Sequence, residues 1–292
     1  MVEFAQQVIS GVAIGCVYGL VALGFVLVYK ATEVVNFAQG ELMMVGAFFA
    51  FTFTTLTGLS FWIGVGAAVA AMAALGALID RIVIRPLVGQ PAFAIFMATV
   101  GIGLLARSVA GMVPGWGFET HALVTPFSDR VVGLGTLTLS QEHLSIIVAT
   151  VLLVALLAAF FRFSRLGVAM QATSQNQLAA AYMGIPIKRV YMLIWALSAA
   201  VAGFAGILLA PIAFVHVNMG FIGLKAFPAA VLGGFGSIPG AIAGGLIIGV
   251  VEALAGFYLP EGFKDVAAYV VLLAVLIVRP RGLFGVSTRR RV

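Results

Sequence analysis

The sequence consists of long apolar runs that carry almost no charge, and this feature limits the fold most severely. Hydrophobic residues make up 63% of the 292 residues and charged residues only 9%, whereas a soluble domain carries about 25% charged residues. Because so few charges cannot cover a surface that faces water, and because the mean hydropathy is +1.18, we expect an integral membrane protein. The apolar spans run over residues 7–29, 40–57, 62–80, 92–112, 143–161, 189–212 and 266–278, with a glycine-rich apolar region at 222–258.

These spans predict helices rather than the strands of a membrane barrel. Barrel strands alternate apolar and polar residues, but these runs are continuous, as in 151–157. Only helices and closed barrels satisfy every backbone polar group in lipid. A helix needs about 20 residues to cross the hydrocarbon core, so the chain has room for about eight crossings. The prediction is an all-α polytopic membrane protein that forms a single transmembrane domain over residues 1–292.

Small residues recur every four positions in two parts of the chain. Residues at this spacing lie on one face of a helix and let two helix backbones approach closely. The prediction is a tightly packed bundle, with no implication for function. The positions are Gly11, Gly15 and Gly19, then Gly240 with Gly244 and Gly245 with Gly249.

The basic residues orient the predicted bundle. If the spans simply alternate, twelve of the 16 basic residues fall on one side, which the positive-inside rule makes cytoplasmic. The N-terminus is then outside and the C-terminus cytoplasmic, and the lack of a basic region at the N-terminus predicts no cleaved signal peptide. The twelve are Lys30, Arg81, Arg85, Arg162, Arg165, Lys188, Arg189, Arg279, Arg281, Arg289, Arg290 and Arg291. The opposite side holds the acids Glu3, Glu119, Asp129, Glu142, Glu261 and Asp265.

The glycine-rich region at 222–258 must enter the membrane and return, because six spans leave the chain outside by residue 212. Its first part, 223–235, is too short to cross comfortably at about 1.5 Å per residue, and glycines and a proline then break the helix. We expect a short half-helix, a turn inside the membrane and a longer helix back out. The turn is either a pathway element or a packed hairpin without substrate contact. Its residues are Gly233, Gly234, Gly236, Ser237, Pro239 and Gly240.

Polar residues interrupt the apolar pattern between the first two spans. Asn36 and Gln39 offer uncharged amide groups, and Glu41 is placed to cap the N-terminus of the second span. Polar groups in the hydrocarbon usually face a cavity or one another. The segment is therefore either a pathway lining or a short cytoplasmic turn with a capping acid.

Three further charged residues fall in apolar regions. Arg107 and Lys225 are expected to extend to an interface. Glu252 lies deep in the second arm of the glycine-rich region. It is either a functional candidate, as an acid inside a membrane, or an interfacial residue if the helix boundary is shifted by one turn.

The longest segment on the basic side joins the fifth and sixth spans. Its residues 167–182 contain few helix breakers and predict one short helix, with Met170, Leu178 and Tyr182 on one face and Gly184 and Pro186 beyond its end. We expect this helix to dock on a partner rather than to serve as a plain connector.

Motifs of catalysis are missing from the sequence. No lysine follows a glycine in the manner of a nucleotide-binding loop, the histidines lack metal-ligand spacing, and Cys16 is the single cysteine. We expect no enzyme activity, no cofactor and no metal.

Four segments together resemble a known family: 35–41 (Val-Asn-Phe-Ala-Gln-Gly-Glu), 162–185, 224–249 with its Ala-Val-Leu-Gly-Gly-Phe-Gly-Ser-Ile-Pro-Gly-Ala core, and the tail with 264–266 and 279–282. They are similar to the membrane permease subunit of ABC importers for branched-chain amino acids. Many members have histidine where this chain has Gln39, which removes a titratable group. The glutamate that often opens the coupling pattern is Leu178 here.

The resemblance implies a permease of the bacterial inner membrane that works with four kinds of neighbour. These are a second homologous permease that forms a heterodimer with this chain, two cytoplasmic ATP-binding cassette ATPases, a periplasmic or extracellular substrate-binding protein and the lipid bilayer; no nucleic acid is implied. The residues expected at the translocation pathway or gate are Asn36, Gln39, Glu41, Gly233, Gly234, Gly236, Ser237, Pro239, Gly240 and Glu252. Those expected to couple to the ATPase are Arg165, Gln171, Ala179, Ala180, Tyr182, Met183, Gly184 and Arg189.

The expected substrate is a small amino acid such as leucine, isoleucine or valine. Relatives that handle urea, short amides or aromatic acids leave an alternative within the same family. An ion-driven secondary transporter is a second alternative, but it usually holds more acids or bases inside the membrane than this sequence does.

Overall fold

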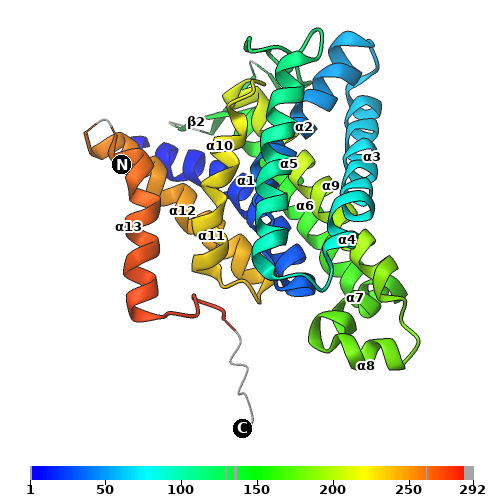
Figure 1. Ribbon diagram of the computed structural model, residues 1–292. Helices are drawn as coiled ribbons and strands as arrows, with labels where there is room; N and C mark the ends of the chain where they lie inside the picture. The colour runs from blue at the N-terminus through cyan, green and yellow to red at the C-terminus, as the bar shows by residue number, and fades with distance from the viewer. Residues whose placement is uncertain (1, 129, 135–136, 261, 286–292) are drawn as a thin grey trace.

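The computed structural model describes residues 2–128, 130–134, 137–260 and 262–285, and it is a bundle of helices (Figure 1). Asp129, Glu261 and Arg289–Arg291, which entered the charge argument, lie outside these residues. The elements are α1 (Val2–Thr32), α2 (Gln39–Phe51), η1 (Thr52–Leu56), α3 (Phe61–Ile79), η2 (Asp80–Ile84), α4 (Arg85–Leu87), α5 (Ala92–Met112), β1 (Val131–Leu134), β2 (Leu137–Ser140), α6 (Gln141–Phe163), α7 (Arg165–Gln175), α8 (Gln177–Tyr182), α9 (Ile187–Ala213), α10 (Met219–Leu224), α11 (Ala226–Gly233), α12 (Ile238–Tyr258) and α13 (Phe263–Val278).

Every predicted apolar span is helical, and the all-α prediction is confirmed. Six helices of the described chain are long and apolar enough to cross a membrane: α1, α3 continued to Leu87, α5, α6, α9 and α12. α2 with η1, and α13, are shorter, so a count of eight crossings stays a prediction. The antiparallel hairpin β1–β2, which the sequence analysis did not predict, lies between α5 and α6.

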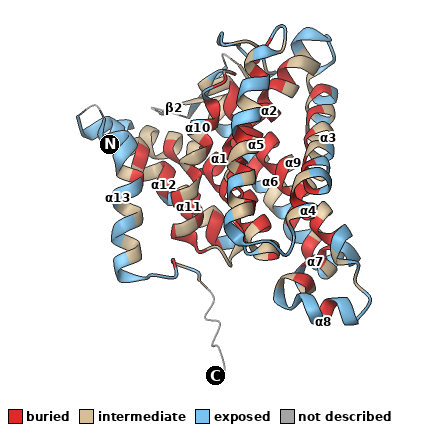
Figure 2. Ribbon diagram, in the orientation of Figure 1, coloured by how far each residue is buried: buried red, intermediate tan, exposed pale blue. Residues whose placement is uncertain are grey.

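The centre of the bundle is α1, which packs against α12, α9 and α11 and is buried along most of its length (Figure 2). α1 and α12 meet through glycines. A Cβ added at Gly245 would lie 2.3 Å from the nitrogen of Gly19, and one at Gly249 would lie 2.3 Å from the Cα of Gly15. The predicted tight packing at this spacing is confirmed.

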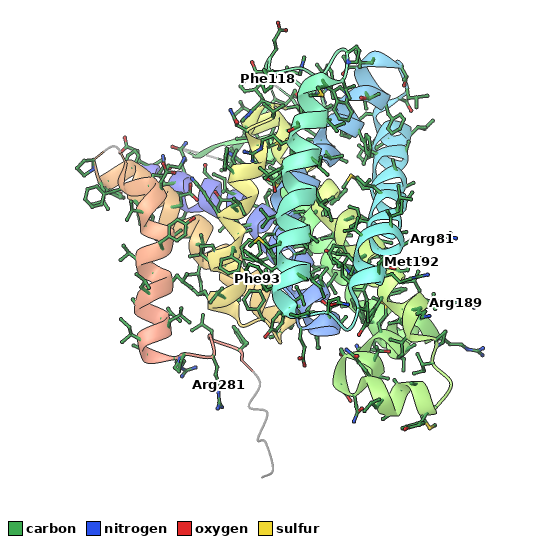
Figure 3. All side chains as sticks on the ribbon, viewed as in Figure 1. Arg81, Phe93, Phe118, Arg189, Met192 and Arg281 are labelled. Carbon is green, nitrogen blue, oxygen red and sulfur yellow. The ribbon has the colours of Figure 1, made fainter. Side chains whose placement is uncertain are left out.

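One end of the bundle carries most of the described basic residues, among them Lys30, Arg162 and Arg279, and hydrogen bonds tie its segments together. The Arg85 guanidinium donates to the carbonyl of Lys188 at 3.2 Å, and the Gln177 amide donates to the carbonyl of Ala31 at 3.0 Å. We call this the basic end. At the opposite end His121 pairs with Val215 as an isolated bridge. Figure 3 shows Arg189 and Arg281 toward the lower part of the view and Phe118 at the top.

The glycine-rich region forms a broken arm followed by a long helix, as expected. The arm is α10 and α11, which are separated at Lys225, and α12 is the helix that returns. The turn between α11 and α12 lies at the basic end, because the amides of Leu283 and Phe284, just beyond α13, donate to the carbonyls of Leu232 and Gly233 at 2.8 and 3.1 Å. The turn therefore stands level with the end of α13, and the prediction of a turn inside the membrane is wrong. We call it the α11–α12 corner.

Candidate functional site

The polar segment between α1 and α2 folds back into the bundle. Asn36 and Gln39 have no exposed surface, and the Asn36 amide donates to Gln39 Oε1 at 3.0 Å. Gln39 in turn donates to the carbonyl of Ser198 on α9 at 3.3 Å, and the Ser198 hydroxyl donates to the carbonyl of Gly24 on α1 at 3.0 Å. These groups form a satisfied polar network where three helices meet.

This network lies inside the bundle rather than in an exposed turn. Gly24 precedes the end of α1 by eight residues, which is about 12 Å along a helix. A Cβ at Gly24 would fall on the Gln39 amide, so only glycine permits this approach. The burial of both amides excludes an exposed turn, and a role in lining a pathway stays a prediction. The sequence analysis did not single out Ser198. Its contact with Gln39 could not be predicted from the sequence, because the two positions are 159 residues apart.

Glu41 forms an ion pair with Arg107 of α5. Arg107 Nη2 lies 2.8 Å from Glu41 Oε1, and the guanidinium carbon lies 3.9 Å from the centre of the Phe221 ring on α10. Glu41 is in the first turn of α2, as predicted, where a negative charge is favourable. The sequence predicted that Arg107 extends to an interface. This is wrong, because Glu41 neutralises the Arg107 charge within the bundle.

A second charged cluster surrounds Glu252, which is only 2% exposed. Its carboxylate accepts hydrogen bonds from the Tyr18 hydroxyl at 2.7 Å and from Lys225 Nζ at 2.9 Å. Lys225 Nζ also contacts Asp265 Oδ1 at 2.6 Å. The sequence predicted that Lys225 extends to an interface. Instead its ammonium group is paired with two carboxylates, and it joins the break between α10 and α11 to α12 and α13.

The two charged clusters hold the two ends of α10. Gly220, near its start, lies against Glu41 and Arg107, and Lys225 follows its last residue. Gly223 packs against Gly40 of α2 so closely that an added Cβ would lie 2.5 Å from the Gly40 Cα. The short helix is therefore fixed between α2, α5 and α12 by ion pairs and by backbone contact.

A row of aromatic rings joins the polar segment to the α11–α12 corner. The ring centres are 4.9 Å apart for Phe96 and Phe37, 5.5 Å for Phe37 and Phe227, 5.8 Å for Phe227 and Phe235, and 4.8 Å for Phe235 and Tyr29. All five side chains are only partly buried. This aromatic row was not predicted, since its members come from α1, α5, α11 and two connecting segments.

The corner itself is held by backbone contacts. Gly233 and Gly240 touch, since a Cβ on either would lie 2.0–2.3 Å from the other's carbonyl oxygen, and Gly234 has a φ of +95°. Ser237 caps α12 by accepting from the amide of Gly240 at 3.1 Å, and Pro239 lies in the first turn, where its missing N–H costs nothing. Gly236 lies between these residues and is half-buried. The structure brings these residues together, but it does not bring them to Asn36, Gln39 or Glu252.

The predicted docking helix is two helices that project from the basic end (Figure 1). α7 ends at Gln175, and the Asn176 side chain caps α8 by accepting from the amide of Ala179 at 3.0 Å. The prediction of one helix is wrong because Asn176 is a strong N-cap. The prediction that Met170, Leu178 and Tyr182 share one face is also wrong. Met170 is buried, with 3% of its surface exposed, whereas Leu178 and Tyr182 point outward.

Most of the predicted coupling residues are accessible. Ala180 is the exception at 4% exposed, and Gly184 ends the segment with a φ of +81°. Leu178, Tyr182 and Met183 are 72%, 89% and 83% exposed, and we call these three the docking patch. The other accessible members are Arg165, Gln171, Ala179, Gly184 and Arg189.

The described residues contain no group of three or more His, Cys, Asp or Glu side chains placed to hold a metal ion. Two ion-paired sets lie at the two ends of α10, and a further ion pair joins Arg85 to the buried Asp80 at 3.4 Å near the basic end. The site therefore consists of buried amides, paired charges and aromatic rings, which fix the positions of closely packed helices relative to one another.

Comparison with known proteins identifies the family. Residues 7–278 match the model of the branched-chain amino acid transport system / permease component family. The chain is 34% identical to the high-affinity branched-chain amino acid transport system permease protein LivH of Salmonella typhimurium, over 97% of this chain and 96% of that protein. It is 31% identical to the corresponding permease protein BraD of Pseudomonas aeruginosa, again over 97% and 96%.

A solved structure shares the fold. PsaBC from Streptococcus pneumoniae, in complex with Fab, superposes with a TM-score of 0.53 at 15% sequence identity, covering 95% of this chain and 92% of that one. The family match extends over α1 to α13 and includes both the polar segment and the α11–α12 corner. The chain is a multi-pass membrane protein that belongs to the family of permease components of branched-chain amino acid transport systems.

Proposed function

We propose that this chain is the permease subunit of an ABC importer that moves a branched-chain amino acid across the bacterial inner membrane. The observation that carries the proposal is the end-to-end similarity to permeases named for this transport. It is supported by the two helices α7 and α8, which project beyond the bundle and end in an exposed apolar patch. The partners are two ATPases, a substrate-binding protein and a second, homologous permease.

The basic end faces the cytoplasm in this proposal. The helix ends there carry Lys30, Arg162 and Arg279, and the positive-inside rule favours their retention on the cytoplasmic side. The N-terminus is then outside and the residues after α13 are cytoplasmic, so the chain, as one transmembrane domain, crosses the membrane an odd number of times.

The docking patch is the proposed contact with an ATPase. Leu178, Tyr182 and Met183 expose large apolar surface on a short helix that Asn176 caps and Gly184 ends. A capped helix that enters a partner's groove is a recurrent way to transmit motion. With Leu178 at the first position of the pattern, the contact is apolar where many relatives place a carboxylate.

The proposed passage runs along the side that α5 shares with α10 and α11, and the second permease closes it. Asn36 and Gln39 are positioning residues there, because they are fully buried and hold the segment that carries Phe37. Phe37 and Phe227 then form the narrow part of the passage near the basic end. Motion of α10 and α11 would open it, and Glu41 and Glu252 hold the start of that arm and its break at Lys225.

The test is uptake by the purified permeases, reconstituted in liposomes with the ATPases and the binding protein. We expect labelled valine or leucine to accumulate only when ATP and the binding protein are both present. Uptake that persists without ATP would refute the ABC mechanism and favour an ion-driven carrier.

The substrate class is tested in the same liposomes with competing ligands. Isoleucine, leucine and valine should compete with the labelled amino acid, whereas urea, acetamide and phenylalanine should not. Competition by urea or acetamide alone would move the chain to another branch of the family. Tight binding of labelled leucine by the isolated permease would contradict the view that selectivity resides in the binding protein.

A further inference from the structure

Two arginines at the basic end have no acidic partner. Arg81 lies in η2, directly beyond α3, and Arg189 lies in the first turn of α9. Both residues are exposed, and neither forms an ion pair with any other residue that the structure describes. Figure 3 shows the two on the same side of the molecule, with Met192 labelled between them. Their charges therefore come from different helices to one part of the surface.

The packing of α3 and η2 against α9 places the two arginines at similar levels. A Cβ added at Gly76 would lie 2.4 Å from the carbonyl oxygen of Trp195, and Arg85 donates to the carbonyl of Lys188 at 3.2 Å. The residue numbers rise along one segment as they fall along the other, so the two segments are antiparallel. Arg81 is about midway between the two contacts on its own segment. It is therefore level with the first two turns of α9, which hold the second arginine.

The acid nearest to Arg81 in the sequence is already neutralised. Asp80 is 1% exposed and accepts a hydrogen bond from Arg85 Nη2 at 3.4 Å. The π-helical turn of η2, in which the Arg85 amide donates to the Asp80 carbonyl, stacks these two residues. Glu33 is the other acid described at the basic end, and it forms no ion pair with a described residue. The charges of Arg81 and Arg189 are thus available to a ligand from outside the chain.

The position of Arg81 corresponds to the edge of the hydrocarbon core. From Phe61, the first residue of α3, to Arg81 the helix rises about 30 Å, which is about the thickness of that core. Leu78 and Ile82, on the same outward side of the helix, are 51% and 62% exposed. Since α3 is long and apolar enough to span a membrane, these two side chains face acyl chains. Arg81 therefore reaches the level of the lipid headgroups.

This level distinguishes a lipid from the ATPase as the ligand. α7 and α8, which carry the docking patch, project beyond the bundle from the basic end (Figure 1). The two arginines instead flank the partly buried Met192, where α3 and α9 leave the hydrocarbon. A partner in water would meet the docking patch first and would leave Leu78 and Ile82 uncovered. A phosphate that carries acyl chains complements both the charged and the apolar part of this surface.

We infer that this surface binds one anionic phospholipid. Its phosphate lies between Arg81 and Arg189, whose planar guanidinium groups can each donate two hydrogen bonds to phosphate oxygens. One acyl chain lies along Leu78 and Ile82. Basic sites between spanning helices on the cytoplasmic side favour anionic headgroups, whereas a zwitterionic headgroup would bring an ammonium group to two unpaired cations. In the orientation proposed above the lipid belongs to the cytoplasmic leaflet, but its binding does not depend on what the chain transports.

The test compares three forms of the full chain, purified in mild detergent from liposomes with equal amounts of phosphatidylglycerol and phosphatidylethanolamine of the same acyl chains. Native mass spectrometry should show that the wild-type chain retains phosphatidylglycerol in preference. Arg81→Gln/Arg189→Gln should lower the retained phosphatidylglycerol about fivefold, because it removes both forked donors. The matched control Arg279→Gln/Arg281→Gln removes the same two charges at exposed positions of the basic end and should retain the lipid as wild type does.

Three results would overturn the inference. An equal loss of lipid in both double variants would show a general attraction to the basic end and no site at Arg81 and Arg189. Equal retention of the two lipids by the wild-type chain would remove the preference for an anionic headgroup. Loss of the ATPase from the complex with Arg81→Gln/Arg189→Gln, with lipid retained, would show that a protein covers this surface.

A second measurement needs no substitution. The Tm of the wild-type chain, followed by exposure of the buried Cys16 thiol, should rise when phosphatidylglycerol is added to the detergent solution. It should rise less with phosphatidylethanolamine and less with inorganic phosphate. An equal rise with inorganic phosphate would show a site for a free anion and overturn the assignment to a lipid. An equal rise with both lipids would contradict the role of the two arginines.

Discussion

Gly249→Ala tests the close contact between α1 and α12. The added Cβ would lie 2.3 Å from both the Cα and the nitrogen of Gly15, and 2.5 Å from the carbonyl oxygen of Gly11. Carbon atoms in contact are normally about 3.5 Å or more apart, so the helices must separate by roughly 1.2 Å. Backbone atoms cannot rotate away as a side chain can, and the whole interface must therefore shift.

The magnitude follows from two opposing effects. Overpacking of a tight core costs about 1–3 kcal/mol, and we take about 3 kcal/mol because backbone is the obstacle on α1. Alanine improves on glycine inside a helix by about 1 kcal/mol. The expected loss of unfolding free energy is therefore about 2 kcal/mol, which corresponds to a fall in Tm of about 4–8 °C for a chain of this size class.

The chain supplies its own reporter and its own control. Cys16 is the single cysteine of the sequence and is 4% exposed, so a fluorogenic thiol reagent reacts only as α1 becomes accessible on heating. Gly101→Ala, on α5, meets nothing within 4 Å and should raise Tm slightly by helix propensity. If Gly249→Ala and Gly101→Ala share the same Tm, glycine contact between α1 and α12 does not determine stability.

Three further predictions concern the charged, aromatic and exposed groups. Lys225→Met leaves the Glu252 carboxylate buried without a cation and should lower stability by about 3 kcal/mol, which the additional change Glu252→Leu should largely restore in the same thiol assay. Phe227→Ala removes the middle ring of the aromatic row and should raise ATP-independent leakage of valine from liposomes several-fold; unchanged leakage would place the narrow part elsewhere. Tyr182→Ala should weaken ATPase binding about tenfold in pull-down titrations with Tm unchanged, whereas Arg81→Ala, at an exposed position outside the predicted coupling residues, should bind as wild type.

The positions of the spanning helices follow from the sequence because each is an uninterrupted apolar run. The predicted span 92–112 coincides with α5, and the glycines of α1 indicate which face packs. The broken arm at 222–258 was likewise predicted, since glycine and proline interrupt helices wherever they cluster. These features depend on residues close together in the sequence and on the apolar surroundings of the helices. Both can be inferred from the sequence alone.

The partners of the polar residues could not be predicted in the same way. Glu41 and Arg107 are 66 positions apart, and Tyr18 and Glu252 are 234 apart. Composition alone favours an interface for an isolated Arg107, and only the fold shows that α5 brings it to α2. Asn176 is a different case, because its preference for N-cap positions is a local signal that permits the break between α7 and α8 to be predicted.

The corner between α11 and α12 depends on residues that follow the last helix. Leu283 and Phe284 supply the amides for the carbonyls of Leu232 and Gly233, and a chain cut after Val278 would leave both carbonyls to find other donors. Any protein or tag that pulls on 279–285 therefore acts on the foot of the broken arm through two hydrogen bonds. Residues 279–285 thus link any pulling force to the α11–α12 corner. A fusion partner added beyond Gly285 would preserve these two hydrogen bonds.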